Sequence, residues 1–267
     1  MKNDYVLGNH SNELVRLQIQ AAFFESMARD ALQKAGIRNG LECLDVGCGV
    51  GSVSRLLGDM VGSKGRVVGI DVDEKYVSYC KKNNKRRNTS FLCADITKGA
   101  PTGEKFDIIY SRFMFVHLKD MVAALESMIR MLKKNGVIII QELDHAPNSW
   151  MSYPKSEAVA RLQKIYVSLI RRLGGDPLAG RKLYGMFLDL GLDSSVECYS
   201  PCLVMGKKPF NELGWRIAQS MRPMATSLGI ATDAEYSKLM RDLKALSFDR
   251  QSFVVYARIF SVIGKKR

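Results

Sequence analysis

The chain has 267 residues and a formal net charge of +13, with 46% hydrophobic and 25% charged residues. This is the composition of an ordinary globular protein, and the length fits one large α/β domain with insertions or a small domain with an appendage. No apolar run approaches the roughly 18 residues that a membrane-spanning helix needs, and the first residues lack the apolar core of a secretory signal. We therefore expect a cytoplasmic protein without a membrane partner.

The basic excess has a functional and a structural interpretation. Lys and Arg gather at residues 81–87, at Arg171 and Arg172, and at residues 265–267. Such clusters can neutralise the phosphates of a nucleic acid. These clusters are scattered along the chain and are not interleaved with aromatic residues that could stack on bases. We therefore favour a solvated basic surface over a nucleic-acid partner.

The six cysteines are expected to be reduced and structural. Most of them lie inside predicted strands or helices, where a thiol packs as a small apolar group, and the cytosol keeps thiols reduced. Cys198 and Cys202 are spaced CxxxC without a further cysteine at the distance that a metal cluster needs. No metal site is predicted.

An N-terminal helix is predicted from about Ser11. Apolar residues recur there on one helical face, at Leu14, Leu17, Ala21, Phe24 and Met27. Gly36 is expected to end the helical region. Tyr5 precedes the helix, and His10 is assigned to the surface or to a lid.

The sequence LECLDVGCGVGSVS at residues 41–54 has the pattern of a strand, a tight turn and a helix. The turn contains Gly47, Gly49 and Gly51, which permit backbone angles closed to other residues and let a ligand lie against the main chain. Free N–H groups at the N-terminus of the following helix attract anionic groups. A nucleotide-like ligand is expected at this turn.

Four more apolar strands are predicted, at residues 66–71, 89–94, 106–110 and 137–140. Helices are predicted between them at residues 74–85 and 121–132, with residues 133–136 as the basic last turn and glycine stop of the second helix. This alternation predicts a parallel sheet covered on both faces, with the ligand at the carboxyl edge of the strands. Asp71 ends the second strand, 20 residues after Gly51, where ribose-binding folds place a carboxylate.

The second half of the chain is less regular. Helices are predicted at residues 153–173 and 180–190, and two or three more at residues 213–246, broken at Pro223 and Gly229. Residues 195–205 are predicted as a strand, and residues 253–263 as a final β-rich run.

Five segments carry a resemblance to a known family. They are LDVGCGVG at residues 44–51, GIDVD at 69–73, ADI at 94–96, FDIIYSRFMFVHL at 106–118 and LKKNG at 132–136. In this order and spacing they resemble the class I S-adenosylmethionine-dependent methyltransferases of the small-molecule type. The resemblance implies an α/β, Rossmann-like, seven-stranded, mostly parallel sheet with an antiparallel last strand. Residues 195–205 and 253–263 would form its terminal pair.

The resemblance also implies a division of the chain around the cofactor. Residues 1–40 would form an N-terminal helical lid, and residues 41–145 the S-adenosylmethionine-binding α/β core. Residues 146–180 would be a helical insertion. Residues 181–267 would complete the core and carry a second helical insertion at residues 207–246.

The family pattern further implies which residues hold each end of the cofactor. Gly47, Cys48 and Gly49 would pass beneath its methionine part, and Asp45 would hold the amino group. Other contacts to the methionine end are expected from Ser111, Arg112, Gln20 and Arg16. Asp71 would bind the ribose hydroxyls and Val72 would lie against the adenine. Asp95 would accept a hydrogen bond from the adenine amino group, with the backbone of Ile96 beside it.

Catalysis of methyl transfer depends mainly on alignment, because the reaction is an in-line displacement at a sulfonium. Orientation alone can supply roughly 7 to 11 kcal/mol, and a base is needed only if the acceptor must lose a proton. His117, Glu142 and His145 are the candidate catalytic residues. His117 has an alternative interpretation as a helix-entry residue packed on the sheet, and the other two as polar loop residues.

We hypothesise an S-adenosylmethionine-dependent methyltransferase that acts on a small, partly apolar molecule. Two alternatives remain: methylation of RNA, motivated by the charge of +13, and a non-catalytic cofactor-binding scaffold or partner subunit. A homodimer is also considered. An NAD-dependent enzyme is disfavoured by the GxGxG spacing and by the Asp95–Ile96 pair.

Overall fold

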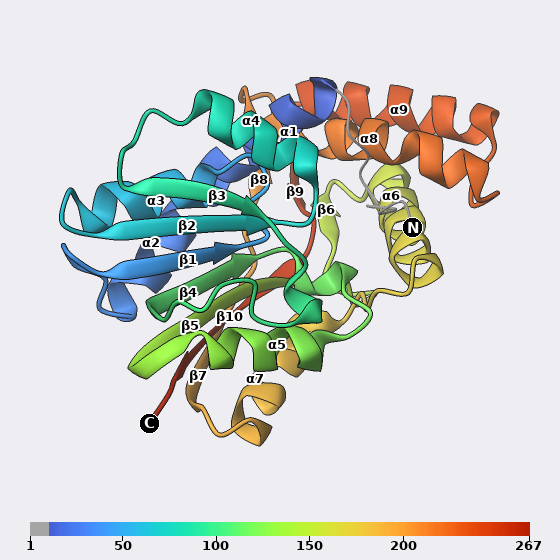
Figure 1. Ribbon diagram of the computed structural model, residues 1–267. Coiled ribbons are helices and arrows are strands. Elements are labelled where there is room, and N and C mark those ends of the chain that lie inside the picture. Colours follow the sequence, from blue (N-terminus) through green and yellow to red (C-terminus); the bar gives the residue numbers. More distant parts are fainter. Residues whose placement is uncertain (1–10) are drawn as a thin grey trace.

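A twisted sheet of seven strands forms the centre of the computed structural model, which describes residues 11–267 (Figure 1). Tyr5 and His10 lie outside the described residues. The strand order is β3-β2-β1-β4-β5-β10-β7; β10 runs antiparallel to both β5 and β7, and the other neighbouring pairs of this sheet are parallel. The strands are β1 (Glu42–Val46), β2 (Arg66–Asp71), β3 (Thr89–Cys93), β4 (Phe106–Arg112), β5 (Leu132–Asp144), β7 (Asp193–Tyr199) and β10 (Arg258–Lys265). The predicted fold class is confirmed.

Helices cover both faces of the sheet, which explains why its central strands are apolar along their whole length. On one face lie α2 (Glu25–Lys34), α3 (Ser52–Val61) and α4 (Glu74–Asn83), and Leu57 of α3 packs with Ile108 and Ile139 of the sheet. On the other face lie α5 (Met121–Arg130) and α7 (Ala179–Asp189). Two short 3-10 turns, η1 (Ile96–Lys98) and η2 (Phe115–His117), follow β3 and β4 at the carboxyl edge.

A cap of further elements lies beyond the ends of the parallel strands (Figure 1). It contains α1 (Ser11–Phe23), α6 (Glu157–Arg172), α8 (Leu213–Ser227), α9 (Asp233–Phe248) and the turn η3 (Phe210–Glu212). It also contains a small sheet of β6 (Met151–Tyr153), β9 (Phe253–Val255) and β8 (Leu203–Val204). Leu162 of α6 and Leu239 of α9 belong to the same hydrophobic cluster as Leu44 of β1. Most of the cap therefore shares one core with the sheet.

The N-terminal helix buries a different face from the one that its apolar residues predict. It breaks at Phe24 into α1 and α2, and Leu14 and Leu17 are only half-buried. The residues of α1 that face inward are Glu13, Arg16 and Ile19. Periodicity could not identify this face, because a Glu and an Arg that satisfy each other can be buried together.

The segment before strand five does not form the last turn of a helix. The helix α5 ends at Arg130, and residues 133–136 belong to β5. Leu132 pairs with Phe106, and the register then shifts so that Val137 pairs with Ile108. Asn135 has a φ of 61° within this irregular stretch. The basic run and the glycine were expected to end a helix. They belong instead to an irregular, bulged part of a strand.

Three predictions for the second half were also too simple. Residues 195–205 and 253–263 each split into two strands that enter different sheets, so the small sheet was not foreseen. Pro223 was expected to break a helix and lies inside α8, where packing against α1, α6 and α9 outweighs the loss of one backbone bond. Gly229, with a φ of 66°, does lie just beyond that helix.

None of the helices within residues 11–267 has the length and apolarity needed to cross a lipid bilayer.

The shared core gives a test of the cap's contribution to stability. Leu162 has no exposed surface, so Leu162→Ala should lower the free energy of unfolding by about 2–5 kcal/mol. Leu188 on α7 is 48% exposed, and Leu188→Ala should change it by about 0.5 kcal/mol or less. Urea unfolding followed by circular dichroism measures both values, and equal effects would show that α6 does not belong to the core.

Candidate active site

The glycine-rich turn after β1 is held against the end of β2. The backbone N–H groups of Gly47 and Cys48 both donate to the carbonyl oxygen of Ile70, at 2.8 and 2.9 Å. Gly49 has a φ of 51°, and no atom lies within 4 Å of the place where a Cβ would be. A Cβ on Gly47 would lie 2.9 Å from the sulfur of Met114. The turn is therefore open at Gly49 and covered by Met114 at Gly47.

Asp71 faces this turn from the end of β2. Its Oδ2 accepts a hydrogen bond from the N–H of Gly49 at 2.8 Å, and its Oδ1 accepts one from the N–H of Asp73 at 3.0 Å. Burial raises the pKa of Asp71, although these backbone N–H groups oppose the shift. Val72 follows with 46% of its surface exposed. An acid and an exposed apolar side chain thus lie beside the open glycine.

Asp45 lies within β1, two residues before Gly47. It is 2% exposed, and its Oδ2 accepts a hydrogen bond from the hydroxyl of Ser54 at 2.6 Å. Burial raises the pKa of Asp45 to about 6, while the hydrogen bond from Ser54 and the charge of Arg112 act in the opposite direction. This carboxyl group can therefore gain or lose a proton close to neutral pH.

The remaining candidates at the carboxyl edge make local bonds. Asp95 accepts from the N–H of Thr97 at 3.0 Å and from its hydroxyl at 2.7 Å, so it caps the turn η1, where Ile96 is buried. The hydroxyl of Ser111 is buried and donates to the carbonyl of Val46 at 2.9 Å. Arg112 donates to the carbonyl of Phe24 at 3.2 Å, which ties β4 to the junction of α1 and α2.

A narrow cavity of about 50 Å³ lies between this edge and the cap. Two polar side chains of α1, Arg16 and Gln20, line it, and so does His145 after β5. The rest of the wall is largely apolar or aromatic: Phe24, Phe113, Leu143, Trp150, Tyr166, Pro201, Leu203, Leu213, Ile217, Tyr256, Ala257 and Ile259. It has the character of a small-molecule pocket, with few polar groups on an apolar wall.

Arg16 is held in place by a buried network. Its Nε and Nη2 donate to the two carboxylate oxygens of Glu13, at 2.8 and 2.5 Å, and its Nη1 donates to Oε1 of Gln20 at 2.5 Å. The hydroxyl of Ser220 on α8 donates to Glu13 at 2.6 Å. Both charged side chains are almost fully buried. The bidentate pair therefore presents little net charge to the cavity.

The three candidate catalytic residues lie in distinct environments. Burial and the charge of Arg16 lower the pKa of His117 to about 4. Burial and His117 lower the pKa of His145 to about 3, so both rings are neutral at pH 7. Burial raises the pKa of Glu142 to about 7, opposed by backbone N–H groups such as that of Leu143, which donates at 2.7 Å. Of the three, only His145 lines the cavity.

Sequence reasoning missed several residues that shape this region. Trp150 donates its indole N–H to Nδ1 of His145 at 3.0 Å. Tyr166 and Tyr256 pack against this pair, with ring centroids 4.7 Å from His145 and 5.2 Å from Trp150 respectively. No spacing rule joins residues so far apart in the chain. The pairing of Glu13 with Arg16 could have been found from their three-residue spacing on a helix.

A family model described as a methyltransferase domain matches residues 37–186, more than half of the chain. The chain belongs to this methyltransferase family. The match includes the glycine turn, Asp71, Asp95 and the strand that ends at Asp144, so the class I resemblance is confirmed.

Relatives of this methyltransferase match a little under half of the chain. It is 28% identical over 123 residues to the malonyl-[acyl-carrier protein] O-methyltransferase of Acetivibrio thermocellus, covering 46% of the chain and 43% of that protein. It is 31% identical over 112 residues to the demethylmenaquinone methyltransferase of Staphylococcus aureus, covering 42% and 46%. These matches span less than half of either relative.

Among solved structures, the methyltransferase is similar to the phosphoethanolamine N-methyltransferase 2 of Haemonchus contortus, determined with phosphomonomethylethanolamine and S-adenosylhomocysteine. The TM-score is 0.59 at 18% identity, covering 94% of this chain and 58% of that one. At this identity the likeness supports the fold.

The pKa of Asp45 gives a test of the site's electrostatics. Between about pH 4 and pH 6 the unfolded chain loses the proton of this carboxyl group while the folded protein keeps it, so folding stability falls as pH rises through this window. Asp45→Asn can still accept from Ser54 and does not titrate. Relative to this variant, the wild-type free energy of unfolding should fall by up to about 3 kcal/mol across the window.

Chemical denaturation at a series of pH values measures this difference. Parallel stability curves for the two proteins would contradict a raised pKa at Asp45.

Proposed function

We propose that this protein transfers a methyl group from S-adenosylmethionine to a small, partly apolar molecule. The observation that carries the proposal is the hydrogen bond that holds Asp71 at the open turn of Gly49, with a second acid, Asp45, at the end of the strand that leads into this turn. Carboxylates at the carboxyl edge of a parallel sheet suit a ligand with hydroxyl and ammonium groups.

The methionine end of the cofactor is proposed to lie along the turn of Gly47, Cys48 and Gly49. Asp45 would hold the amino group, since a buried carboxylate is stabilised by a cation that replaces the lost water. Further contacts to this end are proposed from Ser111, Arg112 and Gln20. Bound S-adenosylmethionine would supply an electrophilic methyl group on a positively charged sulfur.

The adenosine end is proposed to lie against the end of β2. Asp71 would accept from the ribose hydroxyls, and the exposed side chain of Val72 would pack on the adenine. Both bonds from Thr97 go to Oδ1 of Asp95, and Oδ2 lies 3.7 Å from the amino group of Lys98. Oδ2 would accept a hydrogen bond from the adenine amino group. The backbone of Ile96 would border the ring.

The methyl acceptor is proposed to enter the cavity under the cap. The cavity is narrow in this structure, and we propose that α1 moves to admit the acceptor. In this proposal residues 1–40 serve as a lid over the core of residues 41–145. Residues 146–180 and 207–246 supply the other walls, and the rest of 181–267 completes the core.

Alignment in a dry pocket is proposed to provide most of the catalysis. A base is required only for an acceptor that must lose a proton. For such an acceptor His117 and Glu142 remain candidates: His117 is a weak base because of its lowered pKa, and Glu142 has a pKa near 7 but does not line the cavity.

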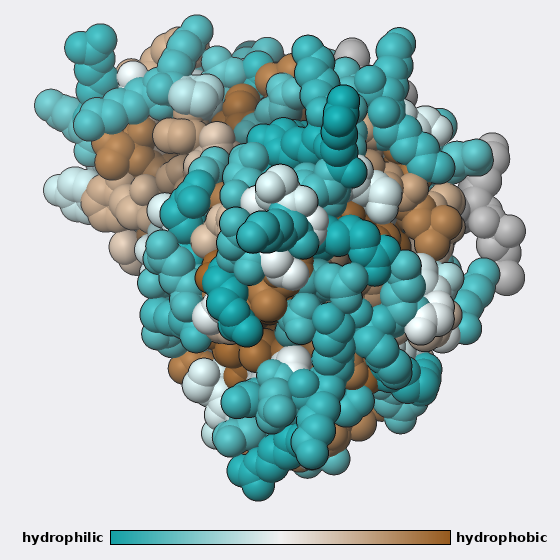
Figure 2. All heavy atoms as spheres, turned by 60° about the vertical axis from the view of Figure 1, so that its left-hand side comes forward, coloured by the Kyte–Doolittle hydropathy of each residue, from teal (hydrophilic) through white to brown (hydrophobic). Residues whose placement is uncertain are grey.

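The distribution of charge favours a small acceptor over RNA. The basic clusters lie at the end of α4, at the end of α6 and at the C-terminus of β10, which are separate parts of the molecule (Figure 1). Figure 2 shows hydrophilic residues spread over one face with apolar residues between them. Steep salt dependence of RNA binding would instead favour an RNA substrate.

A cytoplasmic location and a homodimer belong to the same proposal. All six cysteines are free thiols, and Cys93, Cys198 and Cys202 are exposed, which suits a reducing compartment. Met151, Tyr153 and Val204 of the small sheet are exposed apolar residues that a second copy of the chain could cover.

Calorimetry with S-adenosylhomocysteine tests the proposed function. We expect micromolar binding, and Asp71→Asn should weaken it by about 10- to 100-fold because charge-assisted bonds to the ribose are lost. Asp189→Asn, the same substitution at an exposed position of α7, should leave the affinity unchanged. No binding of the nucleoside, or binding of NAD in its place, would exclude the proposed function.

A further inference from the structure

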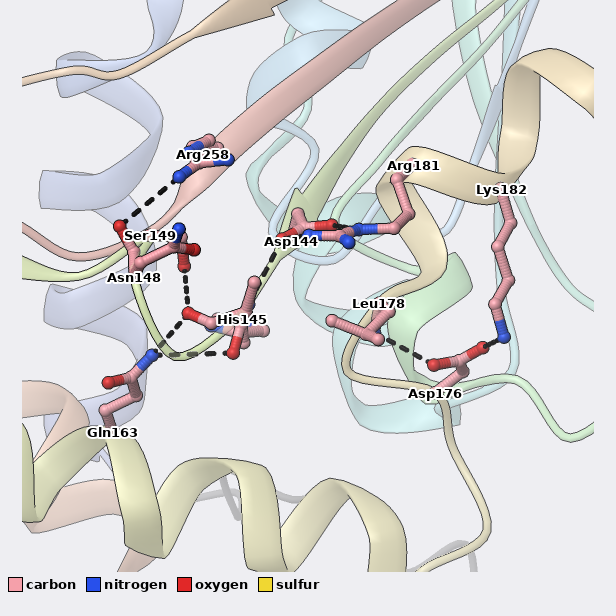
Figure 3. Close-up of polar contacts among 11 residues, drawn as sticks. Asp144, His145, Asn148, Ser149, Gln163, Asp176, Leu178, Arg181, Lys182 and Arg258 are labelled. Atoms are coloured by element: carbon pink, nitrogen blue, oxygen red, sulfur yellow. Dashed lines mark hydrogen bonds and ion pairs between the residues drawn. The ribbon is translucent and has the colours of Figure 1, made fainter.

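The loop that carries His145 is bonded to side chains of α6 and α7 (Figure 3). Asp144 is paired with the guanidinium of Arg181 on α7, whose Nη2 donates to Oδ1 at 2.9 Å. The N–H of His145 donates to the carbonyl of Pro177 at 2.8 Å. Gln163 of α6 donates to the carbonyls of Ala146 and His145, at 2.8 and 3.4 Å. The backbone at residue 145 therefore has little freedom, and its side chain is presented in one place.

The bond from Trp150 determines where the imidazole of His145 carries its proton. An indole N–H can only donate, so Nδ1 of His145 must be the accepting nitrogen at 3.0 Å. A neutral imidazole that accepts at Nδ1 carries its hydrogen on Nε2. Burial and the neighbouring His117 keep the ring neutral at pH 7. Nε2 is consequently a hydrogen-bond donor.

This donor has no partner within residues 11–267. The Nε2 atom is buried without a hydrogen bond, and the side chain is only 4% exposed. A buried donor left unpaired destabilises the folded protein, because it has lost its hydrogen bonds to water. The residue lines the cavity, and the two polar side chains of α1 that also line it, Arg16 and Gln20, are bonded to each other. An unsatisfied N–H at an apolar cavity wall is a recognition element for a ligand atom that accepts.

We propose that the Nε2–H of His145 donates a hydrogen bond to an oxygen of the methyl acceptor. This rests on the proposed function and narrows its substrate to an apolar or aromatic molecule that bears a carbonyl-type oxygen. An ammonium group could not fill the role, because it has no lone pair to accept. His145 is then a substrate-binding residue, and its fixed tautomer leaves no lone pair on Nε2 for a general base.

The tautomer can be tested without cofactor or substrate. In the full chain labelled with ¹⁵N-histidine, long-range proton–nitrogen correlation spectra at pH 7 should show His145 protonated at Nε2, with His145→Gln giving the assignment. Trp150→Phe should shift the population toward the other tautomer. Trp215→Phe, at the other tryptophan of the chain, should leave the His145 signals unchanged. Protonation at Nδ1, or an imidazolium ring, would overturn the proposal.

Ligand selectivity provides the second test. Acetophenone and α-methylstyrene have nearly the same shape and differ by a carbonyl oxygen in place of a methylene. Titration followed by NMR should show acetophenone binding at least about ten-fold more tightly, since the unpaired donor is satisfied only by the ketone. The ratio should fall to about one in His145→Phe and persist in His145→Gln, which keeps an N–H donor.

Equal affinities in the wild type, a ratio unchanged in His145→Phe, or exclusion of both probes from the cavity would each refute the role of His145. The proposed function would fail separately, through absence of S-adenosylhomocysteine binding.

Discussion

The hydrogen bond from Gly49 to Asp71 is the contact on which the candidate site depends. It joins the turn after β1 to the end of β2, and it fixes an acid beside a stretch of backbone that has no side chain. The parallel arrangement of β1 and β2 makes this contact possible, because their carboxyl ends meet at the same edge. With Ile70 accepting from the N–H groups of Gly47 and Cys48, which precede Gly49, the edge is held in place before any ligand binds. Preorganisation of this kind lowers the ordering cost of binding.

The sequence predicted structure best where a short local pattern of residues permits only one kind of backbone. The strand and turn at residues 41–54 and the acid at Asp71 could be predicted, because a glycine turn between a strand and a helix has few structural solutions. The buried face of α1 could not be predicted, because Glu13 and Arg16 look like surface residues until their mutual pairing is known. The small sheet was missed for a related reason: β6, β8 and β9 are two or three residues long and come from three distant segments. Short strands have too little periodicity to be recognised.

The candidate site also combines residues whose position could be predicted from the sequence with residues whose position could not. Asp45, Asp71 and Asp95 lie at the predicted edge, whereas the surroundings of His145 come from tertiary structure alone. Trp150, Tyr166 and Tyr256 reach it from a loop, from α6 and from the link between β9 and β10. Sequence could nominate His145 as a polar residue near the acceptor. Only the direction of the bond from Trp150 distinguishes a donor from a base.

The shared core determines which part of the cap can move away from the cavity at low cost. Because α6, α8 and α9 are continuous with the hydrophobic cluster of the sheet, swinging them away as a body would expose apolar surface at a cost of about 25 cal/mol for each Å². The inner face of α1 holds little more than Ile19 and an ion pair whose charges would regain water when uncovered. We therefore propose that the pocket opens by movement of this single helix, while α6, α8 and α9 stay in place.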